Sequence, residues 1–111
     1  MLEECRGKWK VVLDPDVVEF FEERGLQEEL EEWRRSLEES LNEDPGEIMR
    51  LLREPILYEI DGVKRRRYRL YLRGTGYRLV YVVYPTLCTV YFLLGEKRDE
   101  ETYVRIKRKR L

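Results

Sequence analysis

The feature that most constrains the fold is a change in the spacing of apolar residues at Pro55. Before it, apolar residues recur every three or four positions, as on one face of a helix. The longest such stripe consists of Leu26, Leu30, Trp33, Leu37 and Leu41. After it, apolar and polar residues alternate, as in strands with one buried face. The order of the two patterns predicts an α+β fold in which a helical half precedes a sheet.

Start and stop signals divide the helical half into separate elements. Residues 9–13 have the pattern of a short strand. Asp14-Pro15 then supplies an N-cap and a first-turn proline for a helix that Gly25 stops. The long stripe forms a second helix, and Asp44-Pro45 repeats the start signal for a short third helix that ends before Pro55.

Short turns divide the second half into strands that follow one another as an antiparallel meander. Asp61-Gly62 fits a type I′ hairpin turn, and residues 73–76 and Pro85-Thr86 form the later turns. Because Gly74-Thr75-Gly76 joins two strands and opens no helix, we interpret it as a turn and not as a phosphate-binding loop. The expected strands are residues 56–60, 64–72, 77–84 and 88–94.

A short basic helix over residues 103–110, capped by Asp99, is expected to close the chain. The prediction is therefore a single α+β domain over residues 1–111, with an N-terminal strand, two or three helices, the meander and this C-terminal helix. One face of the sheet should pack on the helices, and the other should be open.

The composition excludes several kinds of site. The chain has no histidine and two cysteines, so we expect no metal, no cofactor, and neither Ser–His nor Cys–His catalysis. Cys88 is expected to be a small buried residue of the last strand, which could pair with Cys5 only if the fold brings them together. No apolar run approaches the roughly 20 residues of a membrane helix, and no signal-peptide pattern is present, so we expect a cytoplasmic protein without a membrane partner.

Charge is divided between the two halves. Residues 1–54 carry 8 Lys/Arg against 17 Asp/Glu, whereas residues 55–111 carry 14 against 6. The acidic helix faces, with Arg34 and Arg35 among their carboxylates, are expected to be solvated surfaces and not a metal or catalytic cluster. A basic half with interleaved Arg and Tyr suits a polyanion, because Arg forms bidentate pairs with phosphate and Tyr stacks on bases. RNA or DNA is the first partner to consider.

Alternation places candidate binding residues on the open face of the expected sheet. Arg67, Arg69, Tyr71 and Arg73 share one side of their strand, and Arg78 lies opposite the apolar side of the next strand. With Arg69, Lys97 and Arg98, Arg78 could form a phosphate clamp, although a solitary surface arginine remains the alternative. The run Lys64, Arg65, Arg66 and Arg67 suits either a phosphate patch or protection of a sheet edge.

Two segments of the basic half resemble a known family. The first, residues 68–81, reads YRLYLRGTGYRLVY and looks like the central segment of RelE toxins, members of the RelE/ParE superfamily. The second, residues 94–103, reads LGEKRDEETY and is similar to the family's closing strand, basic pair and C-terminal tyrosine. The helical hairpin after the first strand fits the family, whereas the Asp61-Gly62 hairpin looks like an addition to it.

The resemblance implies a toxin of a type II toxin–antitoxin system that cleaves mRNA in the ribosomal A site without a metal. Its partners would be the ribosome, mRNA and a cognate RelB-like antitoxin. Matching by motif assigns the catalytic arginine to Arg78, the catalytic tyrosine to Tyr103, and the cation after the final strand to Lys97, with Arg98 as the alternative. Arg69 matches the first of two family lysines, and Tyr71 replaces the second.

This chemistry suits a chain without histidine, because the 2′-hydroxyl of RNA supplies the nucleophile and the protein need only orient it, move protons and stabilise charge. Two alternatives stay open. A ParE-like member of the same superfamily would poison DNA gyrase and need no RNA-cleaving residues. A RelE-fold module could also bind without catalysis, since Tyr71 removes a cation from the site.

Overall fold

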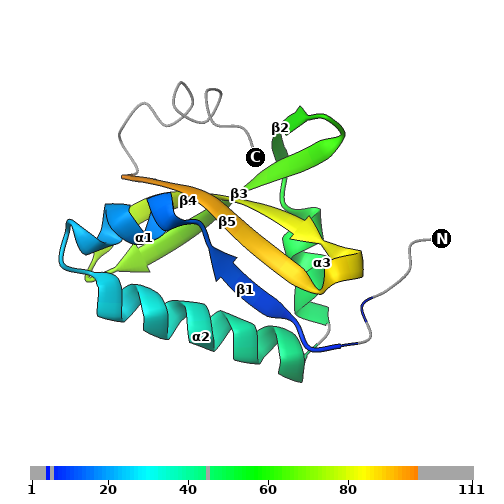
Figure 1. Ribbon diagram of the computed structural model, residues 1–111, viewed down its shortest axis with the longest axis horizontal. Coiled ribbons are helices and arrows are strands. Elements are labelled where there is room, and N and C mark those ends of the chain that lie inside the picture. The colour runs from blue at the N-terminus through cyan, green and yellow to red at the C-terminus, as the bar shows by residue number, and fades with distance from the viewer. Residues whose placement is uncertain (1–4, 6, 45, 98–111) are drawn as a thin grey trace.

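The computed structural model describes residues 5, 7–44 and 46–97, and its elements follow the predicted order (Figure 1). The helices and strands are β1 (Lys10–Leu13), α1 (Pro15–Glu22), α2 (Gln27–Glu43), α3 (Gly46–Arg53), β2 (Ile56–Ile60), β3 (Val63–Leu72), β4 (Thr75–Tyr84), the short 3₁₀ helix η1 (Pro85–Leu87) and β5 (Thr89–Lys97). The α+β class is thus confirmed. The expected C-terminal helix, residues 103–110, lies outside the described residues.

The five strands form one sheet in the order β1-β5-β4-β3-β2. The antiparallel meander from β2 to β5 is confirmed. However, β1 joins the far side of β5 in parallel, so the sheet is mixed. The three helices come between β1 and the meander in the chain, and they allow this crossover because parallel neighbours cannot be joined by a tight turn.

Local signals at the turns and helix starts act as predicted, with small shifts in boundaries. The Asp14 side chain caps α1 by accepting a 2.9 Å hydrogen bond from the backbone N–H of Asp16. Asp61 and Gly62 both have positive φ, as a type I′ turn requires. The next hairpin turn is shorter than expected, because β4 begins at Thr75 and only Arg73 and Gly74, with φ of 48° and 77°, form the loop.

The helices pack on one face of the sheet and enclose the main core. Leu30, Leu37 and Leu41 of the predicted stripe are buried on α2, and Trp33 packs at the edge of this core. Trp33 also contacts Tyr68 and Phe92, with ring centroids 5.4 and 5.0 Å apart. In the part of the chain that the structure describes, no helix is long and apolar enough to cross a membrane.

Side chains of α2 close the outer edge of β1. Asn42 accepts a 2.7 Å hydrogen bond from the backbone N–H of Trp9 and donates a 3.1 Å bond to its carbonyl. One turn earlier on α2, Glu38 accepts a 2.9 Å hydrogen bond from the backbone N–H of Val11. A further turn earlier, Arg34 donates a 3.2 Å hydrogen bond to the Val11 carbonyl. Part of the acidic helix face therefore pairs with backbone groups that a neighbouring strand would otherwise take.

The second face of the sheet is not uniformly open, contrary to expectation. Val80, Val82, Leu93 and Leu94 form a second buried cluster there. A bulge in β5 contributes to this cluster. Val80 pairs with Leu94 and Tyr81 pairs with Phe92, so Leu93 is an extra residue in β5. The β2–β3 hairpin contributes Leu57, Tyr58 and Val63 to this cluster, so the hairpin covers part of the face that a plain meander would expose.

The two cysteines are joined. Cys5 and Cys88 form a disulfide with their Cα atoms 5.1 Å apart, although 83 positions separate them in sequence. The expectation of a buried strand cysteine is wrong for Cys88, which is half-buried and adopts a left-handed conformation after η1, just before β5. The pairing of β1 with β5 explains the contact, because Lys10 donates its backbone N–H to the carbonyl of Cys88 at 2.8 Å.

Candidate functional site

Two arginines lie directly opposite each other on the face of the sheet away from the helices. Arg69 of β3 pairs in register with Arg78 of β4. Their neighbours along the strands, Leu70, Tyr77 and Leu79, are buried in the core on the helical face, so alternation turns both arginines the other way. Like charges directly opposite each other are destabilising. An anionic ligand between them would remove this repulsion.

An exposed tyrosine extends this pair towards the hairpin turn. Tyr71 is 57% exposed, and its cross-strand partner is Gly76, which offers no side chain. Arg69, Tyr71, Gly76, Tyr77 and Arg78 line a shallow hollow of about 20 Å³. Two guanidinium groups beside an aromatic ring have the composition of a surface that holds a phosphate and stacks a base.

The tight turn after β3 determines this juxtaposition. Because Arg73 and Gly74 form a two-residue loop, Leu72 pairs with Thr75 and the register places Arg69 against Arg78. A shift of one residue would put one member of the pair on the buried face. The register therefore brings together two of the residues of the expected clamp, Arg69 and Arg78.

A larger cavity lies beside Arg69, over the edge of β3. The strand β2 pairs only with the first residues of β3, through Arg66, so the β3 edge beyond that point has no neighbouring strand in the described chain. The cavity has a volume of about 610 Å³, which is in the range of small-molecule sites. Its lining combines apolar and polar residues from three elements: Arg50, Leu51, Glu54, Pro55, Ile56, Leu57, Arg67, Tyr68 and Arg69.

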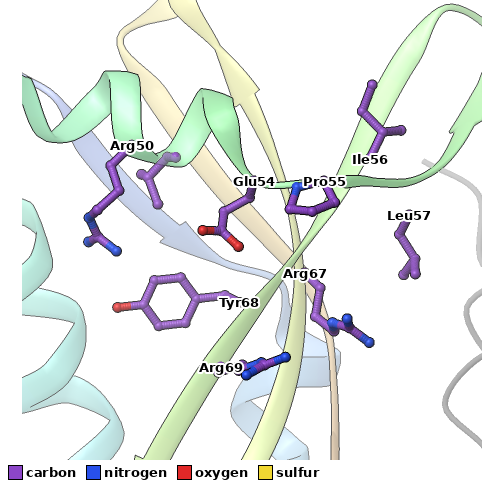
Figure 2. Close-up of a pocket in the computed structure, with 9 residues that line it drawn as sticks. Arg50, Glu54, Pro55, Ile56, Leu57, Arg67, Tyr68 and Arg69 are labelled. Carbon is purple, nitrogen blue, oxygen red and sulfur yellow. The ribbon is translucent and has the colours of Figure 1, made fainter.

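The side chains of β3 reach the cavity from both sides of the strand. Figure 2 shows the Tyr68 ring on one side and the Arg67 side chain on the other, with Arg50 and Glu54 reaching down from the segment above. Arg50 donates from Nε to Glu47 at 2.9 Å. This hydrogen bond, and to a lesser degree the nearby Tyr68 hydroxyl, raises the pKa of Arg50 above its ordinary value. Arg50 therefore stays charged at the cavity rim.

The expected basic patch at the start of β3 does not form as one surface, because successive strand residues alternate between faces. Lys64 is exposed, but Arg65 is only 2% exposed and donates to the carbonyls of Ile60 and Val63 at 3.3 and 3.0 Å. Arg65 thereby stabilises the turn of the β2–β3 hairpin. Arg66 points to the helical side and donates to the Glu54 carbonyl at 2.9 Å.

Arg73 also does not lie with the residues that were predicted to contact RNA. Its position in the turn, with positive φ, interrupts the alternation that would have placed it beside Arg69 and Tyr71. Its guanidinium instead forms an ion pair with Glu29 of α2, on the helical side of the sheet. Of the six residues predicted to contact RNA, Arg67 and Tyr71 remain beside the Arg69–Arg78 pair.

The remaining predicted catalytic residues lie at or beyond the end of β5. Lys97 pairs in register with Tyr77, and Glu96 pairs with Arg78. Arg98 and Tyr103 lie outside the described residues. The structure thus brings the backbone of Lys97 to the strand that carries Arg78, one position from it.

Arg50 and Glu54 were missed by the sequence prediction. Both come from the acidic half, whose charged helix faces were expected to be solvated surfaces. Arg50 lies on α3 and Glu54 directly follows the end of that helix, and nothing local indicates that β3 lies opposite. Within residues 5, 7–44 and 46–97, no group of three Cys, Asp or Glu side chains could hold a metal ion.

No protein-family model, curated protein sequence or solved structure matches this chain. Function must therefore be inferred from the residues of the site and their arrangement.

Proposed function

We propose that this protein is a RelE-like toxin of a type II toxin–antitoxin system, a metal-independent endoribonuclease that cuts mRNA in the ribosomal A site. The observation that carries the proposal is the direct pairing of Arg69 with Arg78 on the face away from the helices, beside exposed Tyr71. Such an arrangement suits an anion, and a phosphate flanked by a stacked base has the matching chemistry. It also occupies the segment that resembles the family.

In the proposed reaction, the 2′-oxygen of one nucleotide attacks the adjacent phosphorus, and the bond from phosphorus to the 5′-oxygen of the next nucleotide breaks. Arg78 and Arg69 hold the phosphate and stabilise the charge that develops on its oxygens. Tyr103 is the proposed base for the 2′-hydroxyl, and Lys97 or Arg98 the proposed acid for the leaving 5′-oxygen. The products are a 2′,3′-cyclic phosphate and a 5′-hydroxyl, so no water, metal or cofactor is consumed.

The test is primer extension on an mRNA in a cell-free translation system, comparing ribosome-bound with free transcript. Cuts within codons of translated message are expected with wild-type protein. Arg78→Ala should reduce cutting by about 100-fold or more, the usual effect of removing a charge-stabilising group. Arg35→Ala is the matched control, because Arg35 is exposed on α2, behind the sheet. Growth arrest without any cutting would contradict the nuclease and favour the ParE-like gyrase poison.

The proposed toxin acts in the cytoplasm and is neutralised by an acidic RelB-like antitoxin. Such a partner would cover Arg69 and Arg78 and remove their mutual repulsion. Arg78→Glu should therefore abolish co-purification with the antitoxin encoded in the native source, whereas Arg35→Glu should not. Retention of the partner by Arg78→Glu would contradict this mode of neutralisation.

A further inference from the structure

The 610 Å³ cavity at the edge of β3 has two chemically different sides. On one side, Arg67 and Arg69 bring positive charge next to the proposed phosphate site, and they share that part of the sheet with Arg78. On the other side lie Tyr68 and the carboxylate of Glu54, which Figure 2 shows pointing into the space between Tyr68 and Arg50. A ligand that fills the cavity would therefore present an anionic part to the first side and a hydrogen-bonding part to the second, where Arg50 and Glu54 offer both a donor and an acceptor.

Glu54 is the informative residue of this cavity. Its carboxylate makes no hydrogen bond or ion pair with another side chain of the described residues, although three arginines line the same cavity. A carboxylate offers two parallel acceptors and no donor. It therefore favours a part of the ligand that donates hydrogen bonds over a phosphate.

The walls around Glu54 suit a flat ring. Tyr68 offers an aromatic ring that is held in place by Trp33, whose Nε1 donates to the tyrosine hydroxyl at 3.4 Å. Pro55, which precedes β2, and Ile56, the first residue of β2, line the cavity, and Ile56 is 47% exposed. A nucleobase has chemistry that matches this lining, because it has apolar faces and a polar edge.

We infer that this cavity is a nucleotide subsite that selects guanine, with Glu54 accepting the N1–H and N2–H donors of the base and with Arg67 and Arg69 holding its phosphate. Guanine is the base that presents two adjacent donors to a carboxylate, whereas uracil presents one ring N–H between two carbonyl acceptors. The inference rests on the proposed function for its biological meaning, since the guanine would be a nucleotide of the mRNA next to the cut. The β2–β3 hairpin builds one wall of the subsite.

Binding of mononucleotides to the full-length protein tests this subsite without any cleavage step. Isothermal titration calorimetry with GMP, and with IMP, which lacks the N2 amino group, should show GMP binding roughly 5-fold or more tightly, as expected for a hydrogen bond to a charged acceptor. Glu54→Gln should weaken GMP binding and remove the difference between GMP and IMP. Glu59→Gln, an exposed change on β2, is the matched control and should bind both ligands as wild type does.

The phosphate contact is tested separately with guanosine, which has no phosphate. Arg67→Ala should weaken binding of GMP but leave binding of guanosine unchanged, whereas Arg53→Ala, at an exposed position of α3, should change neither. Circular dichroism melts of each variant check that it is folded, and Glu54→Asp, which keeps the carboxylate, should retain part of the preference for GMP.

Equal binding of GMP and IMP, or no binding of GMP at millimolar concentration, would overturn the subsite. Neither result depends on the nuclease assay. Selective GMP binding by a protein that cuts no mRNA would support the subsite and contradict the proposed function. A protein that binds GMP and IMP equally, but cuts mRNA in a way that Arg78→Ala abolishes, would support the proposed function and contradict the subsite.

Discussion

Arg69 and Arg78 lie directly opposite each other, and like charges in this position destabilise a sheet. Cross-strand side-chain pairs change stability by about 0.2–1 kcal/mol, and for like charges the change is destabilising. Arg69→Gln should therefore raise the free energy of unfolding by up to about 1 kcal/mol at low salt, and by less at high salt because ions screen the repulsion. Urea unfolding at two salt concentrations measures this, with Arg35→Gln as the control. A destabilised Arg69→Gln would show that the pair is not repulsive.

A second prediction for a single residue concerns the pKa of Tyr91. Its hydroxyl donates a 2.7 Å hydrogen bond to Oδ2 of Asp14, the buried cap of α1. Desolvation, followed by this bond and the charge of Asp14, raises the pKa of Tyr91 to about 12. The folded protein thus holds the tyrosine proton more tightly than the unfolded chain, in which the pKa is near 10.

Stability from this tyrosine is fully present below about pH 10 and is lost as the pH rises from about 10 to about 12. Tyr91→Phe should therefore lower the free energy of unfolding at neutral pH and also flatten its decline over that interval. Urea unfolding at several pH values compares the two proteins. Parallel declines in wild type and variant would show that Tyr91 does not titrate in this range.

At the scale of elements, α2 does more than cover the core. Through Asn42, Glu38 and Arg34 it takes the place of a strand along the outer edge of β1. These three residues repeat every four positions, and the backbone groups they satisfy belong to Trp9 and Val11, two positions apart. One turn of helix rises about as far as two residues of strand, within roughly 1–2 Å, so the two repeats match.

Asn42→Ala should therefore lower the free energy of unfolding by about 1–2 kcal/mol and expose an edge that can pair with a second molecule. Urea unfolding and analytical ultracentrifugation measure the two effects. Glu39→Ala, at an exposed position of the same helix, is the control and should change neither. An Asn42→Ala protein that stays monomeric at high concentration would show that the edge needs no such protection.

At the scale of the whole molecule, the disulfide between Cys5 and Cys88 ties the start of the chain to the beginning of β5. A cross-link that spans 83 positions restricts the unfolded chain strongly and is expected to contribute about 4–5 kcal/mol by the loop-entropy account. Reduction should lower the melting temperature of the wild type. The Cys5→Ser/Cys88→Ser double variant should melt at the lower temperature with or without reductant. Equal melting of oxidised and reduced wild type would contradict this contribution.

Local signals were enough to predict the helices, the meander and the sheet face that carries Arg69 and Arg78. Each of these depends on residues close in sequence: Asp14-Pro15 starts a helix, and alternation along each strand orients the arginines. Their direct opposition was not predicted, because the turn was expected over residues 73–76 and only Arg73 and Gly74 form it. Residues 65, 66 and 73 were placed wrongly because their surroundings come from elsewhere. The Ile60 and Val63 carbonyls hold Arg65, the Glu54 carbonyl holds Arg66, and Glu29 holds Arg73.

Periodicity and turn chemistry act over a few residues, so the amino-acid sequence alone predicts the α+β class, the order of elements, the burial of the leucine stripe on α2 and the strand face that carries Arg69 and Arg78. The parallel pairing of β1 with β5, the contact of Cys5 with Cys88, and the cavity that Glu54 and Arg50 share with Arg67 follow from the tertiary fold. These contacts join segments far apart along the chain, so they form only when the helices pack on the sheet and the whole core closes at once.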